Sequence, residues 1–319
     1  MKKFLSLVLA LCMVLAVASF ASADETIKVG MVTDVGGVND NSFNQFAWAG
    51  LQGLAAEDPS FEVNYLESKT DADYQTNINT FIDEDYDLIV CVGYMLADAT
   101  KEAAESNPDV KFAIIDDASI ELDNVACLTF AQEQCSYLVG LIAGSMTQTK
   151  TVGYVQGMVS DTMNLFGIGY ITGVKEACPD AVILQYNANN FGDIAGGATA
   201  AKDMITKGAD VIYHAAGGTG IGVDADQAAV LGLNYVLSSA LKDAGAGAVD
   251  IAKAVKSGEF EGGVHHYTLA DGAVGFATTG DHIPADVLEK VEAAKAAIIN
   301  GEKIVPTTVA ECPDFTLAE

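Results

Sequence analysis

Arginine is absent from this chain of 319 residues: all 16 basic residues are lysines, and they stand against 44 acidic residues. Without arginine, no site can clamp a carboxylate or a phosphate with a bidentate guanidinium, which counts against the usual amino-acid, dicarboxylate and nucleotide sites. The formal net charge of −28 would also repel a phosphate backbone. The composition therefore excludes nucleic acid as a main partner.

Hydrophobic runs long enough to cross a membrane are missing as well. The apolar run Phe4–Val17 has 14 residues, fewer than the roughly 18 that a spanning helix needs. It follows two lysines and precedes the A-x-A site Ala21–Ala23, so residues 1–23 are predicted to be a signal peptide. Cys12 lies inside this run behind a leucine, where we expect no lipid attachment. The sequence thus predicts an exported protein, periplasmic or extracellular, including the cell surface.

Reactive and metal-binding groups are few. The five cysteines beyond residue 23 are odd in number and form no C-x-x-C pair, so neither a disulfide framework nor a zinc site is expected. The four histidines belong to no H-E-x-x-H motif, and the chain has no G-x-S-x-G motif to accompany them. We therefore predict no catalytic residues, no metal and no cofactor, and a binding protein rather than a secreted hydrolase.

Short β-branched runs alternate with amphipathic stretches from residue 26 onward, which predicts βαβ units and parallel sheets. The expected strands are residues 27–32, 61–66, 88–92, 111–115, 125–130, 151–155, 181–186, 210–214, 235–239 and 265–269. A break near residues 130–150 divides them into two series. The predicted fold class is α/β, with two doubly wound parallel-sheet lobes joined by a hinge.

The first lobe is expected to comprise residues 24–130 and about 240–270, and the second about 131–239 and about 271–319. Open parallel sheets bind ligands beyond the carboxyl ends of their strands. Two such lobes that face each other therefore place a ligand in the cleft between them.

The loop after the first strand carries the strongest local signal. A capped turn explains its glycines and the polar residues before the next helix. It does not explain why Phe43 stands beside Asp34, Asn44 and Gln45 at the mouth of a strand. An aromatic face with amide and carboxylate partners suits a flat heterocycle.

Two other strand ends carry candidate residues. Asp116 and Asp117 end a buried strand, and we expect one to be a solvated turn residue and the other to accept hydrogen bonds from a ligand. The loop 217–222 is rich in glycine but lacks the lysine of a P-loop and the third glycine of a dinucleotide fingerprint. Backbone donors for a sugar hydroxyl fit it better.

Several motifs recur in one order through nearly the whole chain after residue 23. They are Asp34–Gln45, Ala47–Gly50, Gly93–Ala99, Phe112–Asp117, Ala216–Gly220, Gly222–Gln227 and Leu237–Lys242. Together they resemble the basic membrane protein (BMP) family, the purine-nucleoside-binding components of ABC importers. The resemblance implies a type I periplasmic-binding-protein fold with a hinged cleft, a purine nucleoside ligand, an ABC permease as partner, contact with the membrane only through that permease, and a monomer.

The resemblance also implies site residues. The base would stack between Phe43 and Phe191, while Asp34, Ser42, Asn44 and one of Asp116 or Asp117 would address its edge. The ribose hydroxyls would meet Asp224, Lys242 and the glycine loop at Gly218. A neutral, flat, hydroxyl-rich ligand of this kind needs stacking and carboxylates but no arginine.

The chain departs from the family pattern near residue 221. Family members carry a helix and a strand between the glycine loop and the Val-Asp-x-Asp-Gln turn, whereas here Ile221 joins the two directly. A crossover needs about a dozen residues, so the second lobe is predicted to lack one helix–strand unit. Either residues 226–233 form a replacement helix capped by Asp224 or Asp226, with residues 235–239 at the vacated strand position, or the sheet keeps an open edge.

Two alternatives to nucleoside capture remain at this point. A ligand-sensing domain of the same fold fits an export signal equally well. A sugar-binding protein for a ribose-like ligand would also use aromatic stacking and carboxylates.

Overall fold

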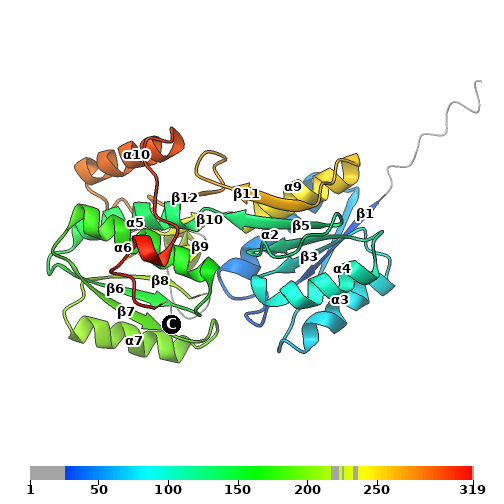
Figure 1. Ribbon diagram of the computed structural model, residues 1–319, viewed down its shortest axis with the longest axis horizontal. Coiled ribbons are helices and arrows are strands. Elements are labelled where there is room, and N and C mark those ends of the chain that lie inside the picture. Colours follow the sequence, from blue (N-terminus) through cyan, green and yellow to red (C-terminus); the bar gives the residue numbers. More distant parts are fainter. Residues whose placement is uncertain (1–25, 217–222, 225, 233–235, 318–319) are drawn as a thin grey trace, which may run out of the picture.

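The computed structural model describes residues 26–317, except 217–222, 225 and 233–235, and it forms two α/β lobes that lie side by side (Figure 1). The first lobe contains a six-stranded parallel sheet of order β11-β5-β4-β3-β1-β2. Its strands are β1 Ile27–Val32, β2 Phe61–Leu66, β3 Leu88–Val92, β4 Lys111–Ile115, β5 Val125–Phe130 and β11 Gly263–Tyr267. All five residues of β3 are buried, because helices cover both faces of the sheet.

Four helices provide that cover. One face packs against α2 (Phe43–Glu57) and α9 (Ala244–Ser257), and the other packs against α3 (Asp73–Asp83) and α4 (Ala97–Ser106) (Figure 1). Because the strands are parallel, their carboxyl ends all lie at the same edge of the sheet, which faces the second lobe. The helices cover the two faces and leave this edge open.

The second lobe contains two small sheets instead of one. The first is parallel, of order β7-β6-β8, and the second, of order β12-β10-β9, is mixed because β12 runs antiparallel to β10. The strands are β6 Thr151–Gln156, β7 Val182–Asn187, β8 Val211–Ala215, β9 Val223–Asp224, β10 Ala240–Lys242 and β12 Val274–Phe276. The helices are α5 Gln132–Met146, α6 Asp161–Ala177, α7 Ile194–Thr206, α8 Gln227–Leu231 and α10 Ala285–Ile299.

Helices α5 and α6 form the core of this lobe and approach each other closely. A Cβ on Gly140 of α5 would lie 2.2 Å from the carbonyl oxygen of Tyr170, and one on Gly169 of α6 would lie 2.1 Å from that of Glu133. Only glycine fits at both positions. Helix α5 also packs against β8 of one small sheet and against β10 and β12 of the other, so it underlies both sheets.

The predicted loss of a helix–strand unit is visible at the junction of the two small sheets. Within the described residues, β8 pairs with β6 alone and β9 has only two residues. The replacement helix is present as α8, and Asp226 caps it by accepting a hydrogen bond from the Ala229 N–H at 3.2 Å. The strand predicted at 235–239 is wrong: residues 236–239 are not in a strand, and β10 begins at Ala240.

Hydrogen bonds hold residues 236–239 against α8 and the end of β12. Ser238 donates to the Ala277 carbonyl at 2.7 Å, and the Ser239 hydroxyl accepts from the Gln227 N–H at 3.1 Å. A hollow of about 220 Å³ lies beside this segment, bounded by α5, α6 and β8. Its apolar floor includes Val139, Ile142 and Ala143 of α5.

Filling that hollow should stabilise the protein. We expect Ala143→Leu to raise the free energy of unfolding by about 1 kcal/mol, because the added side chain enters empty space and buries apolar surface. Urea denaturation of both proteins measures the change. The control is Ala126→Leu in β5, where the same enlargement of a fully buried alanine should cost roughly 1–3 kcal/mol by overpacking. Equal losses in the two variants would contradict the prediction.

Candidate ligand-binding site

A hollow between the lobes lies at the carboxyl ends of strands from both sides. The first lobe contributes residues that follow β1, β3 and β4, and the second contributes β8, β9, β10 and the start of α6. The hollow encloses about 590 Å³, including the part that opens to solvent.

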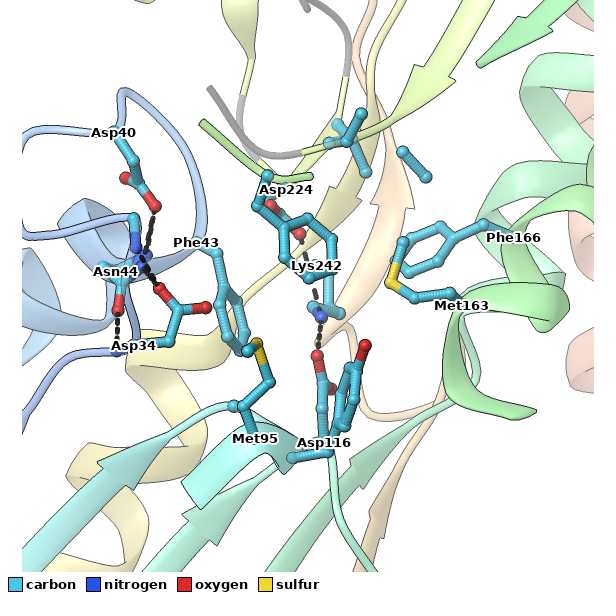
Figure 2. Close-up of a pocket in the computed structure, with 17 residues that line it drawn as sticks. Asp34, Asp40, Phe43, Asn44, Met95, Asp116, Met163, Phe166, Asp224 and Lys242 are labelled. Carbon is cyan, nitrogen blue, oxygen red and sulfur yellow. Dashed lines mark hydrogen bonds and ion pairs between the residues drawn. The ribbon is translucent and has the colours of Figure 1, made fainter. Parts of the chain in front are cut away.

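The loop between β1 and α2 holds Asp34 in a fixed position. Its Oδ1 accepts hydrogen bonds from the Gly36 N–H and from Asn44 Nδ2, both at 2.8 Å. Asn44 Oδ1 in turn accepts from the Asp34 N–H at 3.1 Å. The second carboxylate oxygen, Oδ2, accepts no hydrogen bond from the described residues and remains available to a ligand (Figure 2).

Asp40 organises the same loop. Its carboxylate accepts from the backbone N–H groups of Ser42, Asn44 and Gln45 at 2.9–3.1 Å. Asp40 therefore caps α2, and the Ser42 hydroxyl is free for another contact. Phe43, the first residue of α2, is consequently held at the rim with its ring in the hollow (Figure 2).

Burial raises the pKa of Asp34 to about 6, and the hydrogen bonds from Gly36 and Asn44 offset only part of this effect. Near neutral pH the carboxyl group can therefore be present in either form. As a carboxylate it accepts hydrogen bonds from N–H groups of a ligand, and as a carboxylic acid it donates one.

Lys242 lies at the centre of the site with its charge fully buried. Its ammonium is 2.5 Å from Asp116 Oδ2 and 3.8 Å from Asp224 Oδ1, and its side chain is only 2% exposed. Burial alone would lower the pKa of Lys242, but the charges of Asp116 and Asp224 outweigh burial and raise it. Lys242 is therefore a cation at physiological pH. Burial raises the pKa of Asp224, and Lys242 offsets part of that rise.

Aromatic rings surround this ammonium. It lies 4.4 Å from the ring centroid of Phe43, 5.4 Å from that of Phe166 and 5.6 Å from that of Phe130. In the view of Figure 2, Phe43 and Phe166 lie on either side of Lys242. The hollow thus combines flat apolar walls with one cation and several carboxylates, which suits a neutral planar molecule that carries hydroxyl groups.

The polar contacts of the site join the two lobes. Ser42 of the first lobe donates to Asp224 Oδ2 of the second at 2.6 Å, and Lys242 reaches across to Asp116. Asp116 and Asp224 both have a left-handed backbone, with φ of +67° and +66°. Non-glycine residues adopt this conformation at some energetic cost, and such positions concentrate at functional sites.

The structure brings together most of the predicted site residues. Those that line the hollow are Asp34, Phe43, Asn44, Asp116, Phe191, Asp224 and Lys242. Ser42 contacts the site through Asp224. Asp117 does not line the hollow: its carboxylate accepts from the N–H and hydroxyl of Ser119 at 2.7 Å. Gly218 lies outside the described residues.

Further lining residues were not predicted: Asp40, Tyr94, Met95, Met163 and Phe166. Tyr94 and Met95 directly follow β3, so their place at a strand end was a signal that could have identified them. Met163 and Phe166 lie three residues apart on α6, and this spacing is also typical of an ordinary buried helix face.

No group of three or more His, Cys, Asp or Glu side chains among the described residues is placed to hold a metal ion. None of the helices in that part of the chain is long and apolar enough to cross a membrane.

Comparisons with known proteins agree with this geometry. Residues 27–227 match the Bmp family, described as "ABC transporter substrate-binding protein PnrA-like". The chain is 40% identical to the "CD4+ T-cell-stimulating antigen" of Listeria monocytogenes, with 89% of each chain covered. It is 35% identical to the "ABC transporter nucleoside-binding protein BmpA" of Lactococcus lactis, over 88% of this chain and 89% of the relative.

A solved structure gives the same result for the fold. ABC transporter solute-binding protein from Aeropyrum pernix superposes with a TM-score of 0.81 at 26% identity, covering 90% of this chain and 95% of the other. The alignment with the Listeria relative runs over 318 positions but includes only 89% of this 319-residue chain. About 34 positions of the relative therefore have no counterpart here. A chain that lacks one helix–strand unit is expected to be shorter than its relative in this way.

The raised pKa of Asp34 predicts a specific pH dependence. Below its ordinary pKa of 3.8 the group is protonated in both folded and unfolded states, and above about 6 it is ionised in both. The folded state prefers the protonated form, so the contribution of Asp34 to stability falls as the pH rises through this window. Asp34→Asn should therefore be more stable than the parent by on the order of 2 kcal/mol at pH 7, and the advantage should shrink toward pH 4. Urea denaturation at several pH values measures it, and a difference independent of pH would contradict it.

Proposed function

The chain belongs to the Bmp family of PnrA-like ABC transporter substrate-binding proteins, and from that premise we propose that it captures a purine nucleoside in the interlobe hollow and delivers it to an ABC permease. The observation that carries the proposal is the buried Lys242, held by two carboxylates between aromatic rings. The printed name of the Lactococcus relative, a nucleoside-binding protein, points the same way.

The walls of the hollow account for the base. Phe43 and Phe191 offer apolar faces on which a purine can stack, and each such contact adds roughly 0.5–1.5 kcal/mol beyond area burial. Asp34 Oδ2 and Asp116 Oδ1 accept no hydrogen bond from the described residues, and Asp34 Oδ2 would address the base edge. Because the pKa of Asp34 is about 6, the group can match purines that present either a donor or an acceptor.

The charges account for the sugar and for the absence of a phosphate. Asp224 can accept hydrogen bonds from ribose hydroxyls, while Lys242 can donate to them. The charge of Lys242 is already matched by Asp116 and Asp224, so the site has no spare cation for a phosphate. A nucleoside therefore fits better than a nucleotide.

Several further features belong to the same proposal. The protein is exported by the predicted signal peptide, acts as a monomer, and meets the membrane through its permease. The lobes close around the ligand, and the closed form is the one that a permease recognises. The site binds its ligand without chemical change.

The contribution of Phe43 can be tested directly. We expect calorimetric titration to show binding of inosine, guanosine or adenosine, and Phe43→Leu to weaken this binding about threefold to tenfold because a stacking face is lost. The matched control is Phe260→Leu: its ring packs near Lys111 and is not part of the hollow, so nucleoside affinity should be unchanged.

Free ribose separates the nucleoside from a sugar ligand. If ribose binds as tightly as inosine, or if Phe43→Leu leaves inosine binding intact, the base is not what the site recognises. Binding of no nucleoside at all by a protein that melts cooperatively would contradict the proposal as a whole.

A further inference from the structure

We propose that Gln227 latches the two lobes together from outside the ligand hollow, so that it sets the affinity for every ligand by the same factor. The inference rests on the proposed function, because it describes how the same cleft stays closed. It concerns a residue that touches neither the predicted base position nor the predicted ribose position.

The contact that carries the proposal crosses between the lobes. Gln227 Nε2 donates to the backbone carbonyl of Asn41 in the first lobe at 3.0 Å and to that of Val223 in the second at 3.1 Å. A side-chain amide nitrogen has two hydrogens, so both bonds can form together. Gln227 is 2% exposed and does not line the hollow.

Both ends of this contact are held rigidly. Gln227 is the first residue of α8, the short helix capped by Asp226, and its backbone N–H donates to the Ser239 hydroxyl at 3.1 Å. On the other side, Asn41 has a left-handed backbone with φ of +53°, and its N–H donates to Gln45 at 3.1 Å. Asn41 is thus a third residue at this lobe contact, with Asp116 and Asp224, that has a left-handed backbone.

Opening of the cleft affects the two hydrogen bonds of Gln227 differently. The bond to Val223 lies within the second lobe and survives opening, whereas the bond to Asn41 exists only when the lobes are together. An interaction made only in the closed form shifts the open–closed balance and changes apparent affinity without changing ligand preference. Because an amide and a carbonyl carry no charge, this shift should not depend on pH.

Two other contacts between the lobes are part of the hollow. Ser42 bonds to Asp224, and Lys242 bonds to Asp116; three of these four residues line the hollow itself. Changing them alters the ligand site and the closure together. Gln227 avoids this coupling because its bond to Asn41 involves no residue that lines the hollow, whereas the one from Thr162 of α6, at 3.3 Å, ends on the carbonyl of Asp116.

The test uses the full chain with Gln227→Met, which keeps the length of the side chain and removes its donors. Titration with inosine, guanosine and adenosine should show each dissociation constant raised by one common factor, about threefold to tenfold for a lost hydrogen bond. The ratios among the three ligands, and the size of the factor at pH 6 and pH 8, should stay unchanged.

The control is Ser239→Ala, which removes a hydrogen bond at the same helix end but leaves the bond to Asn41. It should lower the melting temperature without changing any dissociation constant. If Gln227→Met behaves like this control, its role is only structural and the proposal is overturned. Altered ratios among the ligands would overturn it too, because they would mean that Gln227 acts on the ligand.

Small-angle X-ray scattering without ligand separates this proposal from the proposed function. The radius of gyration of Gln227→Met should exceed that of the parent and of Ser239→Ala, because the open form becomes more populated. If no nucleoside binds, the proposed function is wrong, and the radii of gyration alone then test whether Gln227 holds the lobes together. Equal radii for all three proteins would then overturn it.

Discussion

One buried cation determines how the two lobes meet. Lys242 is 2% exposed, and a charge so buried is tolerated only when it is paired and hydrogen-bonded. Its partners come from different lobes: Asp116 follows β4 of the first, and Asp224 ends β9 of the second. Pairing this one lysine with both carboxylates therefore requires the lobes to be in contact, and removing the lysine would leave two buried carboxylates without a cation.

The pairing of Lys242 depends on β9 and β10, and both strands are present although the sheets of the second lobe are small. Strand β9 keeps two residues, and they pair with Ala240 and Leu241 of β10, directly before Lys242. The hollow associated with the missing unit lies beside β8 and α5, not at the strand ends that carry Asp224 and Lys242. The second lobe thus has narrow sheets but keeps the strand ends that line the interlobe hollow.

Much of this arrangement could be predicted from the sequence, since strands β1 to β5 have the predicted bounds and β3, β4 and β5 coincide with apolar runs that are largely buried. Prediction failed where local contacts decide the boundaries. The start of helix α9 at Ala244, for example, is set by Asp243, which accepts a hydrogen bond from the Ala246 N–H. Strand β12 has three residues and gives no periodic signal, and it exists because it pairs with β10.

Some site residues could likewise be predicted from the sequence, and others could not. Asp34 and Phe43 could be singled out because a carboxylate and an aromatic ring at a strand mouth are unusual, whereas Phe166 has the spacing of an ordinary core residue. The sequence could not separate Asp116 from Asp117, because their roles depend on the left-handed backbone at Asp116 and on the turn that binds Asp117 to Ser119. Tertiary contacts, not residue type, decide such cases.

A double-mutant cycle on Lys242 and Asp116 tests the central claim most directly. The free energy of unfolding would be measured for the parent, Lys242→Met, Asp116→Asn and the double variant. Each single change should cost about 3–5 kcal/mol, because Asp116→Asn removes the nearer carboxylate partner of the buried lysine and Lys242→Met leaves two buried carboxylates without a cation. The double variant should cost at least about 2 kcal/mol less than the sum. Effects that add to within about 0.5 kcal/mol would show that the pair is not coupled, and would contradict the account.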